Sequence, residues 1–109
     1  MTPFAQSGKS VAFTAATSAP TAVQASNYEG TSLSGRYRIL NSGTVTVFLG
    51  IGRNATEAAA NASVLTSSAN CLPILPGAVE VFSFGLNSYF TGITASGTSV
   101  VYVTPGAGI

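Results

Sequence analysis

The sequence predicts an all-β fold: a jelly-roll-like β-sandwich of seven or eight short antiparallel strands, in a single domain over residues 1–109. Three observations predict it. Apolar and polar residues alternate with a period of two in several short segments, which is typical of half-buried strands. Signals for turns recur about every 8 to 12 residues. A helical composition occurs in one short segment, near residues 55–62.

The N-terminal third contains two strand candidates. KSVAFTA places Val11 and Phe13 on one face. Pro20 then interrupts the pattern, and TAVQAS is a shorter candidate that follows it. Residues 15–35 are rich in Ser, Thr, Ala and Gly, so part of this stretch is expected to form a loop or an arm.

A β-hairpin is predicted in YRILNSGTVTVFLGIG. Tyr37 and Ile39 alternate with more polar residues and should point inward. Arg36 and Arg38 should therefore point outward together. The turn NSG, residues 41–43, contains the glycine that tight hairpin turns favour. The following TVTVFLG forms the second strand, with three residues inward: Val45, Val47 and Leu49.

One short helix is predicted near residues 55–62, in GRNATEAAANASVL. Asn54 can serve as its N-cap, and Glu57 follows three residues later, as in a capping box. The alanines that come next are strong helix formers. Glu57 is therefore interpreted as a capping residue.

The segment CLPILPGAVEVFSFG contains a broken strand and then a regular one. Pro73 and Pro76 confine the first part to a sheet edge or a turn. In AVEVFSFG both faces are partly apolar, but two phenylalanines bury more area than two valines. Phe82 and Phe84 should therefore point inward, which leaves Glu80 at the rim of the strand.

A second hairpin is predicted near the C-terminal end. Its strands are NSYFTGITAS and TSVVYVTPG, and its turn is residues 95–97. The predicted core includes one residue from each of three strands: Val47, Phe82 and Val101. The two ends have no core-forming pattern, so residues 1–8 and 104–109 are expected to be extended arms that reach a neighbouring molecule.

Charge is scarce throughout the chain. Charged residues make up 6% of it, against about 25% in ordinary soluble domains, and the net charge is +1. Polar character comes mainly from 14 Ser and 13 Thr, beside 16 Ala. Such a surface is weakly repelled from its own copies, and charge is depleted where interfaces are buried. Self-association is therefore favoured, with an unusually neutral monomer as the alternative.

The residues needed for most catalytic and metal sites are missing. The chain has no His, and its carboxylates are Glu29, Glu57 and Glu80. Glu29 and Glu80 could form a glycosidase pair, or could each be solvated or paired with an arginine, which we favour. One Cys with no His and no Asp provides too few ligands for zinc. We predict no enzyme, no catalytic residue, no cofactor and no metal site.

Other ligand classes are equally poorly supported. SGKS at residues 7–10 lacks the first glycine and the preceding strand of a phosphate-binding loop. Basic residues gather only at Arg36 and Arg38, which falls short of a nucleic-acid surface. No apolar run reaches about 18 residues, so no membrane span is expected. Cys71 is interpreted as a small buried residue and not as a nucleophile.

Residues 36–109 resemble a group of small structural proteins encoded by tailed bacteriophages. The resemblance is carried by YRILNSGTVTVFLGIG, by ATEAAANAS and by LPILPGAVEVFSFGLNSYFTGITASGTSVVYVTPGAGI. In that group a hairpin, an Ala-rich segment, a Leu-Pro-Gly turn into a strand and a closing SGT…VYVTPG occur in this order. The resemblance implies a virion component, and by analogy a capsid decoration (cement) protein on the capsid exterior, made in the host cytoplasm.

The expected partners are the protein's own copies, with a trimer preferred, and the major capsid protein or another virion protein. The residues expected to make these contacts are Phe4, Arg36, Arg38 and Ile109. Two alternatives stay open. One is a tail, fibre or head-to-tail junction component of the virion. The other is a carbohydrate- or receptor-binding β-sandwich module, against which the absence of Trp counts.

Overall fold

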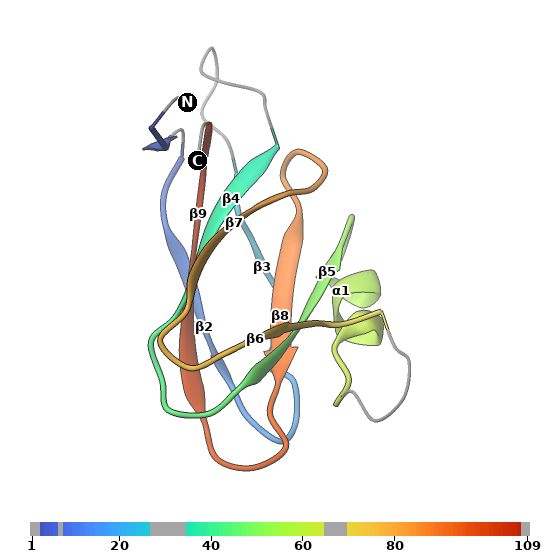
Figure 1. Ribbon diagram of the computed structural model, residues 1–109. Coiled ribbons are helices and arrows are strands. Elements are labelled where there is room, and N and C mark those ends of the chain that lie inside the picture. The colour runs from blue at the N-terminus through green and yellow to red at the C-terminus, as the bar shows by residue number, and fades with distance from the viewer. Residues whose placement is uncertain (1–2, 7, 27–34, 65–69, 108–109) are drawn as a thin grey trace.

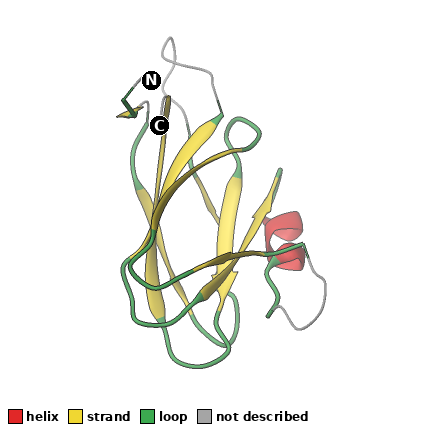
Figure 2. Cartoon of the chain, in the orientation of Figure 1, coloured by secondary structure: helices red, strands yellow, loops and turns green. Residues whose placement is uncertain are grey.

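The chain forms two antiparallel β-sheets that share one core, with one short helix beside them (Figures 1 and 2). This computed structural model describes residues 3–6, 8–26, 35–64 and 70–107. The predicted all-β class with one short helix, α1 (Ala55–Asn61), is confirmed. No helix in the described part of the chain is long and apolar enough to cross a bilayer.

The two sheets contain nine described strands. The five-stranded sheet has the order β1-β9-β4-β7, and β2 also pairs with β9. Its strands are β1 (Ala5–Gln6), β2 (Val11–Ala15), β4 (Arg36–Asn41), β7 (Val79–Ser83) and β9 (Ser99–Ala107). The four-stranded sheet has the order β3-β8-β5-β6. Its strands are β3 (Val23–Gln24), β5 (Val47–Gly52), β6 (Leu72–Ile74) and β8 (Tyr89–Ile93).

The two predicted hairpins are wrong, because the strands of each lie in different sheets. β4 pairs with β7 and β9, whereas β5 pairs with β6 and β8. In the same way β8 belongs to the four-stranded sheet and β9 to the five-stranded sheet. The turns at residues 42–46 and 94–98 therefore connect the two layers and do not close a hairpin.

The buried side chain of Asn41 explains why the chain crosses between the layers here. Its amide nitrogen donates to the carbonyls of Val45 and Ile74, at 2.9 Å each, and its oxygen accepts from the N–H of Gly43. Ile74 belongs to β6, so Asn41 links the end of β4 to the other sheet. The Ser99 hydroxyl bonds to Val45 as well, which ties the second crossing to the first.

The core between the sheets confirms most of the predicted inward faces. Tyr37, Ile39, Val47 and Val101 are fully buried. Phe82 faces inward as predicted and packs against the core, but it is only partly buried. The partial exposure follows from the position of β7 at the edge of its sheet.

Helix α1 begins at the predicted N-cap. The Asn54 side chain accepts the N–H of Glu57 at 2.8 Å, and the Glu57 carboxylate accepts from the backbone N–H and the guanidinium of Arg53. The helix lies close against β5, because two residues of that strand, Gly50 and Gly52, lack a side chain. A Cβ on either glycine would collide with the backbone of Ala58.

The two ends of the chain differ from the expected arms. Thr104 to Ala107 belong to β9, in which residues 104–106 pair with β4 and Ala107 pairs with Ala5, so this segment is not an arm outside the sheet. Ala5 and Gln6 form β1 against the end of β9. Residues 1–2, 7 and 108–109 of the expected arms lie outside the described residues.

Candidate interaction surface

The outward side chains of the five-stranded sheet form one continuous surface, the outer face. Partner residues in neighbouring strands point to the same side of a sheet, so the register fixes which side chains are neighbours. The outer face includes Ser10, Ala12, Arg36, Arg38, Leu40, Val79, Val81, Val100, Tyr102 and Thr104. All of these residues are half-buried or exposed.

An apolar row crosses the outer face from one edge of the sheet to the other. Ala12 is the partner of Tyr102, and Tyr102 is the partner of Leu40. Leu40 in turn is the partner of Val79, and Val81 widens the row along β7. Tyr102 is 43% and Val79 46% exposed. A connected apolar area on the surface, bordered by polar groups, is typical of a site of protein interaction.

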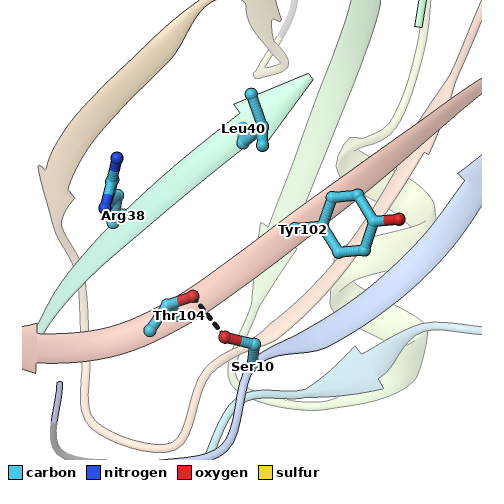
Figure 3. A pocket seen from close by; sticks show the side chains of 5 residues that line it. All are labelled: Ser10, Arg38, Leu40, Tyr102 and Thr104. Atoms are coloured by element: carbon cyan, nitrogen blue, oxygen red, sulfur yellow. Dashed lines mark hydrogen bonds between the residues drawn. The ribbon is translucent and has the colours of Figure 1, made fainter. Parts of the chain in front are cut away.

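A shallow hollow of about 260 Å³ lies on this face (Figure 3). It is lined by side chains from β4, from β9 and from the residue before β2: Ser10, Arg38, Leu40, Tyr102 and Thr104. The hydroxyls of Ser10 and Thr104 are 2.6 Å apart and bond to each other. The hollow therefore offers an apolar side, a guanidinium and hydroxyl groups to a side chain inserted by a partner.

The two arginines of β4 give the outer face its charge. As predicted, Arg36 and Arg38 point outward together, and Arg38 is exposed. The ion pair found among the described residues joins Arg53, just before the N-cap, to Glu57 in the first turn of α1, and is not on this face. A guanidinium has five N–H donors, so Arg38 can bind a carboxylate or backbone carbonyls of a partner.

The structure brings three of the four predicted contact residues to the same region. Gly106 is the partner of Arg36 on the neighbouring strand, and a Cβ on Gly106 would collide with the Phe4 ring. The Phe4 ring therefore lies over the end of β9, on the side to which Arg36 and Arg38 point. Ile109, the fourth residue, lies outside the described residues.

Sequence reasoning missed the apolar row as a unit. Alternation within each strand places Leu40 and Val79 on the outward side, and these two outward apolar residues were the available signal for an exposed apolar surface. Tyr102 joins them only because β4 lies between β7 and β9. The row is a consequence of strand order, which alternation does not determine.

A second hollow, of about 370 Å³, lies between the start of α1 and the connection from β7 to β8. Ile51, Phe84 and Leu86 give it apolar walls, and Arg53 and Glu57 contribute charge. Hydrogen bonds from the Arg53 side chain, and then from its backbone N–H, lower the pKa of Glu57. This carboxylate is therefore ionised at neutral pH and caps the helix, so it is poorly suited to donate a proton.

The remaining candidates for chemistry are spread over the molecule. Glu80 is exposed on β7, whereas Glu29 lies outside the described residues. Within the described ranges, no three His, Cys, Asp or Glu side chains group as a metal site requires. Cys71 is a free, partly buried thiol.

Comparison of the chain with known protein families, with curated proteins and with solved structures found no match.

Proposed function

We propose that this chain is a non-enzymatic structural protein of a tailed-bacteriophage virion, a decoration protein that binds the capsid exterior through its outer face. The observation that carries the proposal is the exposed apolar row of Ala12, Tyr102, Leu40 and Val79. It lies on a chain in which 6% of the residues are charged. The resemblance of residues 36–109 to small phage structural proteins supports the virion as its location.

The strand order supports a jelly roll. In this fold eight strands form two sheets through two Greek keys, and most connections pass from one sheet to the other. Without the two-residue β1, the sheets here have the orders β2-β9-β4-β7 and β3-β8-β5-β6. From β2 onward, the described strands change sheet at each step except between β5 and β6. Viral capsid and lectin domains both use jelly rolls, so the fold agrees with a virion protein without requiring one.

The apolar composition of the outer face suits a contact whose affinity must be kept at physiological ionic strength. Exposed charges are screened beyond about 8 Å at physiological ionic strength, whereas burial of apolar area is not. Each Å² of buried apolar area contributes roughly 25 cal/mol. Copies that are linked to one another would bind the shell through several contacts at once, so a modest area on each copy would be enough. Arg36 and Arg38 would orient the protein on the shell by hydrogen bonds.

Binding of the purified protein to capsids of the virus that encodes it tests the proposal. Tyr102→Glu puts a charge in the apolar row and should reduce affinity at least about tenfold, which corresponds to about 1.4 kcal/mol. Thr56→Glu adds the same charge on the exposed part of α1 and should bind like the wild type. Circular dichroism checks that both variants are folded.

Two results would contradict the proposal. Equal binding of Tyr102→Glu and the wild type would exclude the outer face as the contact. Absence of wild-type binding to any particle, together with selective binding on a glycan array, would support the carbohydrate-binding alternative.

A further inference from the structure

The two sheets differ in how their edges are protected. The edges of the four-stranded sheet are β3, which has two residues, and β6, which has three residues with Pro73 at its centre. The edge position of β6 agrees with the prediction made from Pro73 and Pro76. Short strands and proline prevent an edge from pairing with another chain. In the five-stranded sheet, β1 and β2 form one edge and β7 forms the other. β2 and β7 have five residues each and no proline or lysine.

Of these two edges, β7 is the more open. After β2 the chain turns toward the other sheet, where Ala16 forms a bridge with Ile93. Among the described strands, β7 pairs with β4 alone. Val79 on β7 is 46% exposed, and Leu75, in the turn that leads to β7, is 65% exposed.

The register shows which backbone groups of β7 face away from β4. The N–H of Phe84 donates to Gly35 at 2.7 Å, and the carbonyl of Ala78 accepts from Asn41 at 3.1 Å. Hydrogen bonds to one neighbour alternate along a strand, so even-numbered residues from 78 to 84 bond to β4. The N–H and C=O groups of three residues then point to the open edge: Val79, Val81 and Ser83.

We propose that β7 pairs antiparallel with β7 of a second copy of this chain, about a two-fold axis at Val81. With the axis there, Val81 faces Val81 of the second copy and Val79 faces Ser83. These three residues are the ones with outward backbone groups, so each N–H and C=O at the open edge gains a partner. Such a contact is self-complementary and closes at two copies.

The side chains agree with this axis. On the outer face, Val81 would meet Val81 of the second copy at the axis, and Val79 of each copy would lie opposite Ser83, so the two apolar rows would be connected through the Val81 pair. Arg38 is set back by one strand, beside Val81, so the two arginines are not directly opposite each other. Glu80 would face Phe82 of the second copy and not its own equivalent. No like charges are therefore opposed, which would otherwise destabilise the pairing.

The pairing goes beyond the proposed function, since it is a property of the free protein and does not depend on capsid binding. The dimer can therefore be absent while capsid binding is present, and capsid binding can be absent while the dimer forms. It also gives a dimer, which is an alternative to the trimer expected from the sequence. Molecular mass in solution distinguishes the two.

Light scattering on the full chain, over a range of protein concentrations, gives the first test. The wild type should be a dimer at high concentration. Val81→Lys places two positive charges at the axis and should raise the dissociation constant at least about tenfold. Thr14→Lys adds the same charge to an exposed position of β2 and should dimerise like the wild type. A monomeric or trimeric wild type, or equal dimerisation of both variants, would overturn the proposal.

Thiol cross-linking gives a test that does not depend on the stability of Val81→Lys. In a Cys71→Ala background, Val81→Cys should be converted to a covalent dimer by a short bifunctional maleimide, because residues opposed in an antiparallel pair lie about 5.5 Å apart. Thr14→Cys should stay monomeric under the same conditions. If both cysteines cross-link equally, or neither does, β7 is not the contact.

Discussion

Asn41 is a fully buried polar residue at the point where β4 leaves its sheet. Its side chain makes bonds to two carbonyls and one N–H, on Val45, Ile74 and Gly43. Buried polar groups are tolerated only when such bonds are made. The residue therefore holds the crossing in one geometry, and with it the assignment of β4 and β5 to different sheets.

Asn41→Ala should lower the free energy of unfolding by about 2 to 4 kcal/mol, because several buried backbone groups lose their partner. Unfolding in urea measures this difference. Asn70→Ala, at an exposed position, is the control and should change stability by less than about 0.5 kcal/mol. A loss as small as the control's for Asn41→Ala would show that the crossing is held by other contacts.

Two phenylalanines allow the centre of the core to be compared with its edge. Phe90 is fully buried, and its ring centroid is 5.0 Å from that of Tyr37. Phe82 is partly exposed on the edge strand β7. Phe90→Ala should cost about 3 to 5 kcal/mol in a denaturant melt, and Phe82→Ala less than half of that. The melts are run at concentrations where the protein is monomeric, because a dimer through β7 would cover the edge strand. Equal costs under these conditions would contradict the position of Phe82 at the edge of the core.

At the scale of elements, the start of α1 should make stability depend on pH. The bonds from Arg53 keep the pKa of Glu57 below its ordinary value of 4.5 in the folded chain. Ionised Glu57 therefore stabilises the fold above the unfolded-state pKa, and this contribution is lost as pH falls through the folded-state pKa. The side chain is 36% exposed, so solvent keeps the effect small.

Glu57→Gln should accordingly show a smaller drop in melting temperature between about pH 7 and about pH 3 than the wild type. Arg53→Gln should have a similar effect, because it removes the first cause of the lowered pKa. An unchanged drop in both variants would mean that other carboxylates carry the acid sensitivity.

The elements themselves could be predicted from the sequence more readily than their partners. Alternation is a local property, and it indicated the strands and inward faces of Tyr37, Ile39 and Val47. The turn NSG can serve a hairpin or a crossing equally well. The choice depends on the bond from Asn41 to Ile74, which lies 33 residues further along the chain.

The candidate surface could be predicted only in part, for the same reason. Arg36 and Arg38 follow from alternation within one strand. Residues 104–109 were expected to be an arm because they show no core-forming pattern. Yet Pro105 is fully buried and lies opposite Tyr37, so the strand continues through it. Tertiary packing here overrides a local signal.

At the scale of the whole molecule, sparse charge and a broad outer face act together. Pairing through β7 would place the outer faces of two copies side by side, so that one dimer presents two apolar rows to a shell. In the proposed assembly, low net charge means that copies packed closely on the shell would repel each other little. Each dimer would then bind through two linked contacts.

Binding to capsids should depend little on salt. Raising NaCl from about 0.1 M to about 0.5 M should change the affinity less than about threefold, because apolar burial carries the contact. Arg38→Ala serves as the comparison: if charge dominated, wild type and variant would differ at low salt and converge at high salt. A steep fall of wild-type affinity with salt would contradict an apolar contact.

The most direct test of the central claim is an electron cryo-microscopy map of the virion into which this structure is fitted. We predict density for the two-sheet domain on the capsid exterior, with Leu40, Tyr102 and Val79 of the outer face against the shell. Density with the α1 side against the shell and the outer face toward solvent would contradict the claim, as would absence of the protein from the particle.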